Sequence, residues 1–232
     1  MNASKLSIIL PVYNQADHLR AVVDEYIHEL GRVPVEHEIL LVPNGCRDQS
    51  VAICHQLAER FPSVRVVESA KPGWGRAVRV GLAAATGDLI CYTNMARTTA
   101  ADLALLSIYA VAYPKVVVKA NRKIRDSWTR GLGSLLYNLE CRALFDLSYW
   151  DINGTPKIFP RSFTSLLGLS RNDDLIDVEF NGICLRMNYP MVEVPIFSTR
   201  RHGGSSTTNY QSAFKLYWGA FVMARTWRYT HR

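Results

Sequence analysis

Residues 86–97 hold side chains whose types and spacing could do chemistry on a phosphate-bearing ligand. The segment runs from a Gly-Asp turn through the apolar stretch Leu89–Tyr92 to Asn94 and then to Arg97. A buried parallel strand delivers side chains to a ligand cleft in this way. Magnesium and manganese need anionic oxygen ligands, whereas Asn94 offers a neutral carbonyl and Ala96 offers no ligand atom. We therefore expect a ligand site whose usual metal ligands are absent, and no metal-ligating residue is predicted.

Composition limits the class of protein. The chain has 232 residues, 48% of them apolar and 20% charged, so it can bury a full core and is not a disordered protein. Its five cysteines form no CxxC pair, which predicts reduced, mostly buried thiols in a cytosolic protein. We expect no signal peptide and no membrane-spanning run. The excess of 27 Lys and Arg over 20 Asp and Glu favours anionic partners: phosphates, a lipid surface or nucleic acid.

The elements that must position these residues follow from hydrophobic periodicity. Apolar strands are expected at 6–12, 38–42 and 64–67, each followed by an amphipathic helix, at 16–30, 49–61 and 75–85. Uniformly apolar strands separated by helices predict a parallel sheet covered on both faces. Later in the chain we expect helices at 103–112, 127–145 and 177–187 and strands at 116–120, 157–159 and 191–196. The fold class is therefore α/β, as one compact domain with two lobes.

Four polar segments follow the predicted strands, at residues 11–15, 43–48, 71–76 and 94–97. In parallel sheets ligands bind at the carboxyl ends of the strands. We therefore expect these four segments to meet at one edge of the sheet.

These motifs carry a resemblance to a known family. Residues 6–15, 39–48, 71–78 and 87–88 resemble, in the same order, four motifs of the family 2 glycosyltransferases with the GT-A fold. The resemblance implies a mostly parallel Rossmann-like sheet, with a nucleotide-sugar lobe at residues 1–98 and an acceptor lobe at 99–232. It implies donor binding by Pro11, Tyr13, Gln15, Asn44, Gly73, Arg76 and Asn94.

The second half looks most like the branch that makes polyprenyl- or dolichyl-phosphate sugars. Matches to its motifs lie around residues 121–134, 151–159, 177–179 and 194–206. The resemblance implies an inverting reaction and acceptor or phosphate contacts from Arg122, Ser134, Asp151, Lys157, Arg201 and Ser206. The membrane-spanning tail of many relatives is not seen in this sequence.

The implied reaction displaces a nucleoside diphosphate from a sugar, so the site needs positive potential at the leaving group and a base for a hydroxyl acceptor. In the family an Asp-x-Asp pair holds a metal for the first task, and Asn94 and Ala96 stand at those positions. We expect Arg97, helped by Arg76 and the amides of residues 73–75, to replace the cation. The catalytic residues implied are Asp177, Arg97 and Arg130. No cofactor is required on this hypothesis, although Mg²⁺ or Mn²⁺ could still take part.

Each assignment has a plainer alternative. Arg97 could belong to a helix cap, Asn44 could form a turn without meeting a nucleobase, and Asp177 could pair with an arginine of its own lobe. Any single basic residue of the second half could be ordinary surface charge. Asp177 and Glu179 are expected on opposite sides of one helix, so that at most one faces the cleft.

The carboxyl-terminal segment, residues 214–228, places Phe214, Tyr217, Trp218, Phe221 and Val222 on one helical stripe. The stripe fits either packing against the domain or a peripheral helix on an anionic bilayer. The sequence thus predicts a cytoplasmic glycosyltransferase that uses a UDP- or GDP-linked sugar and a lipid-phosphate or glycan acceptor. No nucleic-acid partner is expected, and peripheral contact with the membrane is one of the two options that the stripe leaves open. A non-catalytic sugar-nucleotide binder is the alternative from another class.

Overall fold

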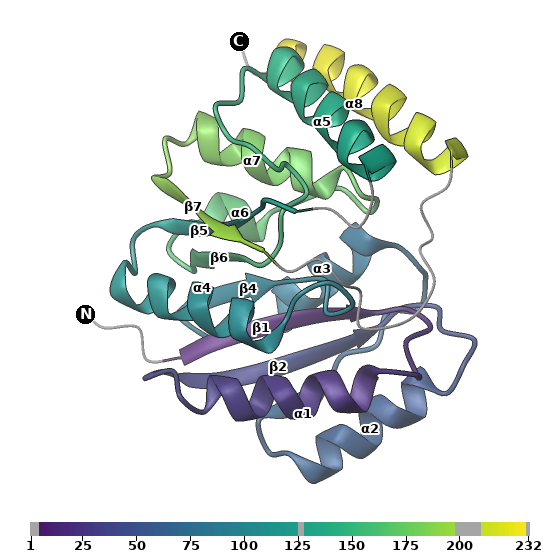
Figure 1. Cartoon of the computed structure of the whole chain (residues 1–232), viewed down its shortest axis with the longest axis vertical. Helices are drawn as coiled ribbons and strands as arrows, with labels where there is room; N and C mark the ends of the chain where they lie inside the picture. Colours follow the sequence, from purple (N-terminus) through teal and green to yellow (C-terminus); the bar gives the residue numbers. More distant parts are fainter. Residues whose placement is uncertain (1–4, 125–127, 198–209, 231–232) are drawn as a thin grey trace.

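A computed structural model defines the fold for residues 5–124, 128–197 and 210–230, with side chains described for 5–124, 131–197 and 215–226. Strands and helices alternate through most of this range (Figure 1). The strands are β1 (Lys5–Val12), β2 (Glu36–Pro43), β3 (Val64–Val66), β4 (Leu89–Tyr92), β5 (Val117–Arg122), β6 (Lys157–Pro160) and β7 (Met191–Ile196). The helices are α1 (Leu19–Leu30), α2 (Ser50–Arg60), α3 (Trp74–Ala84), α4 (Ala100–Ala112), α5 (Trp128–Phe145), α6 (Thr164–Leu167), α7 (Ile176–Arg186) and α8 (Tyr210–Thr230).

The strands form one seven-stranded sheet in the order β3-β2-β1-β4-β6-β5-β7. Pairs β1–β2, β1–β4, β2–β3 and β5–β7 are parallel, whereas β6 runs antiparallel to both β4 and β5. The prediction of a parallel sheet is therefore confirmed for six strands. The short β6 was expected as a strand. Its antiparallel direction was not predicted, because a sequence of four residues does not reveal how a strand runs relative to its neighbours.

Helices cover both faces of the sheet, so its central strands are buried on both sides. Helices α1, α2 and α4 pack on one face, against a cluster that includes Ile8 and Leu41. Helices α3, α6 and α7 pack on the other face, against a cluster that includes Ile9 and Phe159. Helix α3 approaches very closely, because a Cβ at Gly81 would lie 2.2 Å from the Ile9 side chain.

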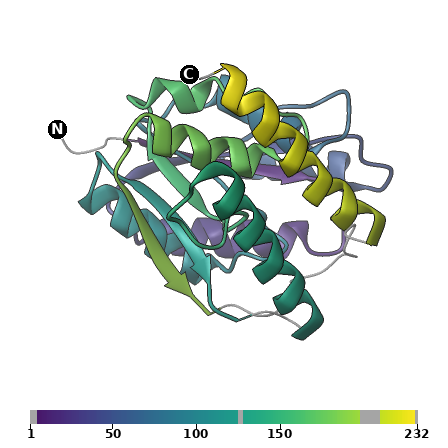
Figure 2. The ribbon, with the colours of Figure 1, turned by 90° about the horizontal axis from the view of Figure 1, so that it is seen from above.

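Helices α5 and α8 lie side by side on the far side of α7, away from the sheet (Figures 1 and 2). Their buried residues include Tyr137 and Cys141 of α5 and Ala220 and Met223 of α8, which pack with Val178 of α7. The sequence stripe on α8 is divided: Tyr217 faces α5 and donates from its hydroxyl to the Gly133 carbonyl, at 2.7 Å. Trp218, Phe221 and Val222 are exposed, and the Phe214 side chain lies outside the described residues.

The predicted helices and strands of the described residues are all present, with ends that differ by a few residues. Helix α6 was not predicted, because four residues show no helical periodicity. The five cysteines are free thiols, four of them buried, as predicted. A division into lobes at residues 98 and 99 stays a prediction, because one sheet runs through both parts.

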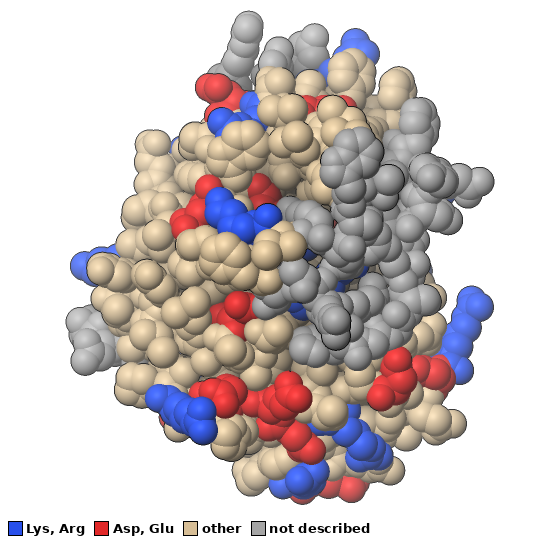
Figure 3. Space-filling model, in the orientation of Figure 1, with Lys and Arg blue, Asp and Glu red and all other residues tan. Residues whose placement is uncertain are grey.

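The described charged side chains are unevenly spread. On the face in Figure 3, acidic and basic side chains gather together over α1 and α2, and smaller mixed groups lie higher on the same face. Ion pairs such as Arg60–Asp24 and Arg32–Glu29 belong to the mixed area. No described helix is long and apolar enough to cross a bilayer.

Candidate functional site

The polar segments after β1, β2 and β3 are joined at one edge of the sheet, as the sequence predicts. Asn44 lies after β2 and is 3% exposed. Its Nδ2 donates to the Val12 carbonyl at the end of β1, at 2.8 Å, and its Oδ1 accepts from the Gly73 amide before α3, at 3.2 Å. In the neighbouring loop the Arg47 amide donates to Asn14 Oδ1, at 2.7 Å. The side chain of Asn44 therefore holds three loops in place.

This arrangement gives Asn44 a structural role in addition to the expected one. Its amide group was expected to meet a nucleobase edge. Both ends of that amide are used inside the protein, because Nδ2 lies 3.3 Å from a second acceptor, the Val42 carbonyl. Asn44 thus positions these loops, and a contact between its amide and a nucleobase stays a prediction.

The residues after β4 form a tight turn. Asn94 Oδ1 accepts from the Ala96 amide at 3.1 Å, and the Asn94 carbonyl accepts from the amides of Arg97 and Thr98. Thr99 then caps α4 by accepting from the Asp102 amide, at 3.1 Å. The expected helix cap beside Arg97 is therefore present, and the half-buried Arg97 precedes it on the loop.

The donor set of this turn does not fit Mg²⁺ or Mn²⁺. The Asn94 side-chain oxygen is engaged by a backbone amide, and the Ala96 side chain is buried and has no ligand atom. Across the described parts of the chain, no three His, Cys, Asp or Glu residues gather into a metal-binding group. Hard cations need several anionic oxygen ligands. The described residues at this turn do not supply them, so we derive no reaction step that uses a metal.

The first turn of α3 faces protein carbonyl groups. A Cβ at Gly75 would lie 2.6 Å from the carbonyl oxygens of Arg171 and Asp173, and the Asn172 carbonyl accepts from the Arg76 amide at 3.1 Å. The Gly73 amide, expected to face a phosphate, instead donates to Asn44. Residues 171–173 therefore cap this helix with their own carbonyls, because the exposed amides of a helix start need acceptors.

The other predicted donor-side residues lie at the same edge. Pro11 is buried in β1 and Tyr13, just beyond it, is 38% exposed. Gln15 is 8% exposed, and its Oε1 is buried without a hydrogen-bond partner in the described structure. The Nε of half-buried Arg76 is also buried without a hydrogen-bond partner among the described residues. Two polar groups of the predicted donor site are thus left to hydrogen-bond with a group outside the described chain.

Asp177, the predicted base or orienting carboxylate, lies in the first turn of α7 and is 4% exposed. Its Oδ1 accepts from the Tyr92 hydroxyl at 2.9 Å and contacts Lys157 Nζ, and its Oδ2 accepts from Trp74 Nε1 at 3.3 Å. The suspected ion pair is present with Lys157, and no arginine among the described side chains forms it. Burial lowers the pKa of fully buried Lys157 to about 8, against the opposing effect of the Asp177 charge.

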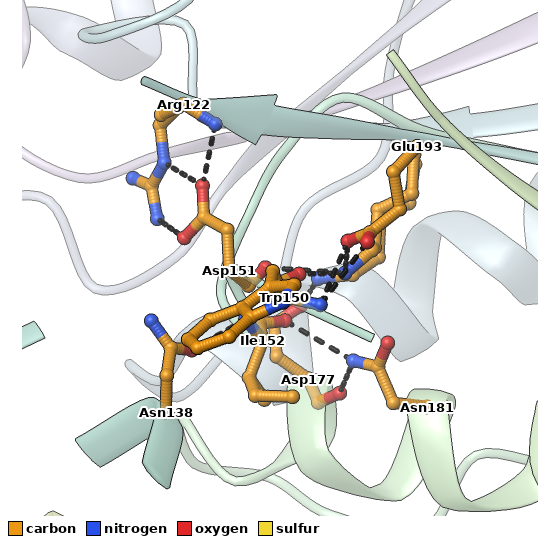
Figure 4. A network of polar contacts seen from close by, with 10 residues as sticks. Arg122, Asn138, Trp150, Asp151, Ile152, Asp177, Asn181 and Glu193 are labelled. Atoms are coloured by element: carbon orange, nitrogen blue, oxygen red, sulfur yellow. Dashed lines mark hydrogen bonds and ion pairs between the residues drawn. The ribbon is translucent and has the colours of Figure 1, made fainter. Parts of the chain in front are cut away.

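A second buried group joins Arg122 to Asp151, two of the predicted acceptor residues (Figure 4). Arg122 Nε and one terminal nitrogen donate to the two carboxylate oxygens of Asp151, at 2.8 and 2.7 Å. Lys119, fully buried, pairs with Glu193 at 2.8 Å and donates to the carbonyls of Trp150 and Asp151. Burial lowers the pKa of Lys119.

The two buried groups are neighbours, because Lys119 of β5 and Lys157 of β6 are opposite each other in the sheet. The sequence did not single out Lys119, Glu193, Trp74 or Tyr92. Lys119 within the apolar strand Val117–Arg122 could have indicated this group, because a buried lysine requires ionic or hydrogen-bonding partners. Asp177 and Glu179 were expected to diverge, and the structure buries both.

The remaining predicted residues fall in two groups. Ser134 is half-buried on α5. The side chain of Arg130 and residues Arg201 and Ser206 lie outside the described residues, so their assignments stay predictions.

Comparison with known proteins finds sequence similarity to sugar transferases. The family model described as "Glycosyl transferase family 2" matches residues 7–94. Undecaprenyl-phosphate 4-deoxy-4-formamido-L-arabinose transferase of Sodalis glossinidius (strain morsitans) is 26% identical over 218 residues, covering 89% of this chain and 63% of the relative. The protein of the same name from Enterobacter sp. (strain 638) is 23% identical, covering 91% and 65%. The chain spans less than two thirds of the length of these relatives.

Solved structures share the fold. Glucosyl-3-phosphoglycerate synthase from Mycobacterium tuberculosis in complex with UDP superposes with a TM-score of 0.71 at 16% identity, covering 96% of this chain and 79% of that one. The same enzyme in complex with Mn²⁺, UDP and phosphoglyceric acid gives 0.73 at 15% identity, covering 96% and 78%. The predicted α/β fold of the GT-A type is thereby confirmed.

Proposed function

We propose that the chain transfers a sugar from a nucleotide sugar to a lipid-phosphate or glycan acceptor, because the model of family 2 of the glycosyltransferases matches residues 7–94. The observation that carries the proposal is the meeting of the loops after β1, β2 and β3 at one sheet edge, held by Asn44. Ligands of open α/β sheets bind at such an edge. In this proposal the diphosphate of the nucleotide sugar lies beside the turn at Asn94.

The positive charge at the leaving group comes, in this proposal, from Arg97 and Arg76. Both are half-buried, and both lie on segments that follow strands of the same edge, as Asn94 does. A fixed guanidinium can stabilise a departing diphosphate without a metal, since it stays charged and donates several hydrogen bonds. The proposed reaction therefore proceeds without Mg²⁺ or Mn²⁺.

The test is release of nucleoside diphosphate from UDP- and GDP-sugars with an undecaprenyl-phosphate acceptor, in EDTA and in manganese. We expect equal turnover in both, and a loss of about 100-fold in Arg97→Ala, the typical effect of removing one oxyanion-stabilising donor. Arg60→Ala, an exposed arginine paired with Asp24, is the matched control and should retain full turnover. Turnover that requires manganese would refute the metal-independent mechanism.

A non-catalytic sugar-nucleotide binder is the second candidate, and one observation favours it. Asp151, Lys157 and Asp177 each have an ionic partner inside the protein, so their presence has a structural explanation. A binder would give a thermal shift with UDP or GDP, because ligand binding stabilises the folded state, but no diphosphate release with any acceptor. The same panel, extended to dTDP, identifies the nucleotide.

A lipid-phosphate acceptor requires the protein to reach a membrane surface, and the outer faces of α5 and α8 suit that contact. Helix α5 turns Leu132, Leu135, Leu136 and Leu139 outward, each between 42% and 51% exposed. Residues three and four apart lie on one helical stripe. Trp218, Phe221 and Val222 form the corresponding exposed stripe on α8, and the cations Lys215 and Arg225 are exposed on the same helix.

We infer that these two stripes rest on an anionic bilayer as an interfacial surface, since apolar faces with basic neighbours bind there. The double variant Leu135→Gln/Leu136→Gln should lose flotation with phosphatidylglycerol liposomes. Ile108→Gln on α4, 49% exposed in the wild type, is the matched control and should float normally. Loss of flotation in the control, or none in the double variant, would contradict this surface.

A further inference from the structure

The two carboxylates at the start of α7, Asp177 and Glu179, both act on the first turn of α3. Both carboxylates are buried, at 4% and 6% exposure, because the first turn of α7 lies inside the protein. A buried carboxylate is stable only when donors satisfy its oxygens. The groups that donate hydrogen bonds to Asp177 and Glu179 show which segments the two carboxylates hold in place.

Asp177 reaches α3 through a side chain. Its Oδ2 accepts from the indole nitrogen of Trp74, the first residue of α3, at 3.3 Å. Its other oxygen accepts from Tyr92, the last residue of β4, at 2.9 Å. The two aromatic rings also pack edge to face, with centroids 6.3 Å apart. Asp177 therefore ties the start of α3 to the end of the strand that leads to Asn94.

Glu179 reaches the same turn through the backbone. It accepts from the Ser170 amide at 2.9 Å, from the Ser170 hydroxyl at 2.6 Å and from the Arg171 amide at 2.9 Å. This fixes residues 171–173, whose carbonyls surround Gly75 and accept from the Arg76 amide. One carboxylate thus holds the first turn of α3 by its tryptophan, and the other holds the loop that caps it.

We propose that Asp177 and Glu179 are a pair of positioning residues that clamp the segment Gly73–Arg76 at the donor site. Asp177 then acts through Trp74 and does not take a proton from the acceptor. The inference rests on the proposed function, because it assigns this segment to the nucleotide-sugar site. The clamp fixes the place from which Arg76 reaches the diphosphate, and it orders the loop before the donor arrives.

Trp74→Phe and Glu179→Gln test the clamp while leaving the Lys157–Asp177 ion pair intact. Phenylalanine keeps an aromatic ring and loses the indole N–H, and glutamine keeps one acceptor oxygen of the two. Tyr113→Phe, at an exposed aromatic residue just after α4, also removes one polar group and is the matched control. Amide hydrogen exchange of residues 71–78 reports on the segment without any ligand, and calorimetric titration with UDP reports on the donor site.

We expect exchange about fivefold faster and UDP binding about fivefold weaker in each variant, the effect of one lost hydrogen bond. The control should match the wild type in both measurements. Unchanged exchange would overturn the clamp. Faster exchange with unchanged UDP affinity would overturn the assignment of the clamped segment to the donor site. If wild-type protein binds neither UDP nor other nucleoside diphosphates, the proposed function fails, while the exchange result still decides whether the clamp exists.

Discussion

Glu38 is a buried carboxylate that makes the stability of the folded protein depend on pH. It lies on β2 opposite Ser7 of β1. Its Oε1 accepts from the Ser7 hydroxyl at 2.6 Å and from the Thr86 amide and hydroxyl at 2.8 and 2.7 Å, and its Oε2 accepts from Arg65 at 3.0 Å. Burial opposes ionisation, but these donors outweigh it and lower the pKa from 4.5 to about 2.

A carboxyl group whose pKa is lower in the folded state stabilises the protein above its unfolded pKa. That stability is lost as the pH falls from 4.5 towards 2. At about 1.4 kcal/mol per pKa unit, the shift is worth about 3 kcal/mol at pH 7. The same relation gives a loss of about 2 kcal/mol by pH 3.

Glu38→Gln removes the charge and keeps the shape, so it isolates this contribution from that of other carboxylates. We expect the variant to be about 3 kcal/mol less stable than the wild type at pH 7 and only about 1 kcal/mol less stable at pH 3. Urea unfolding at both pH values, followed by circular dichroism, gives the two differences. A difference in unfolding free energy that is the same at pH 7 and pH 3 would refute the reasoning.

Three further substitutions probe the packing and the buried charges. Gly81→Ala places a methyl group 2.2 Å from a side chain of β1, so urea unfolding should show a loss of about 1–3 kcal/mol. Lys157→Met leaves the Asp177 carboxylate buried without its ionic partner, and the free energy of unfolding should fall by about 3–5 kcal/mol. Arg122→Lys cannot keep both hydrogen bonds to Asp151, so it should cost about 1–2 kcal/mol; an unchanged urea midpoint would show that the second bond is unimportant.

The sequence predicts the scaffold well because its signals are local. The apolar strands Lys5–Val12 and Glu36–Pro43 and the helices between them follow from periodicity, and so does the meeting of their loops. The antiparallel direction of β6 depends on contacts with β4 and β5, which no local pattern contains. The expectation that no metal is needed, drawn from the residue types at the Asn94 turn, stays a prediction.

The site was harder to predict because a polar residue type does not reveal its partner. Asn44 follows a strand, as expected, but only the structure shows that its amide is used by neighbouring loops. Asp177 and Glu179 are two residues apart, so helical geometry alone predicted opposite directions. The structure satisfies both, because α3 and residues 170–173 pack on different sides of the same helix start.

Helix α5 leaves the sheet after β5, and the chain returns to it in β6, the strand directly beside β5. Strand pairing is therefore complete without the α5 segment, and helix α5 lies away from the strands (Figure 1). We therefore expect that exchanging the exposed leucines of this helix for polar residues changes the proposed membrane contact and leaves the order of the strands unchanged.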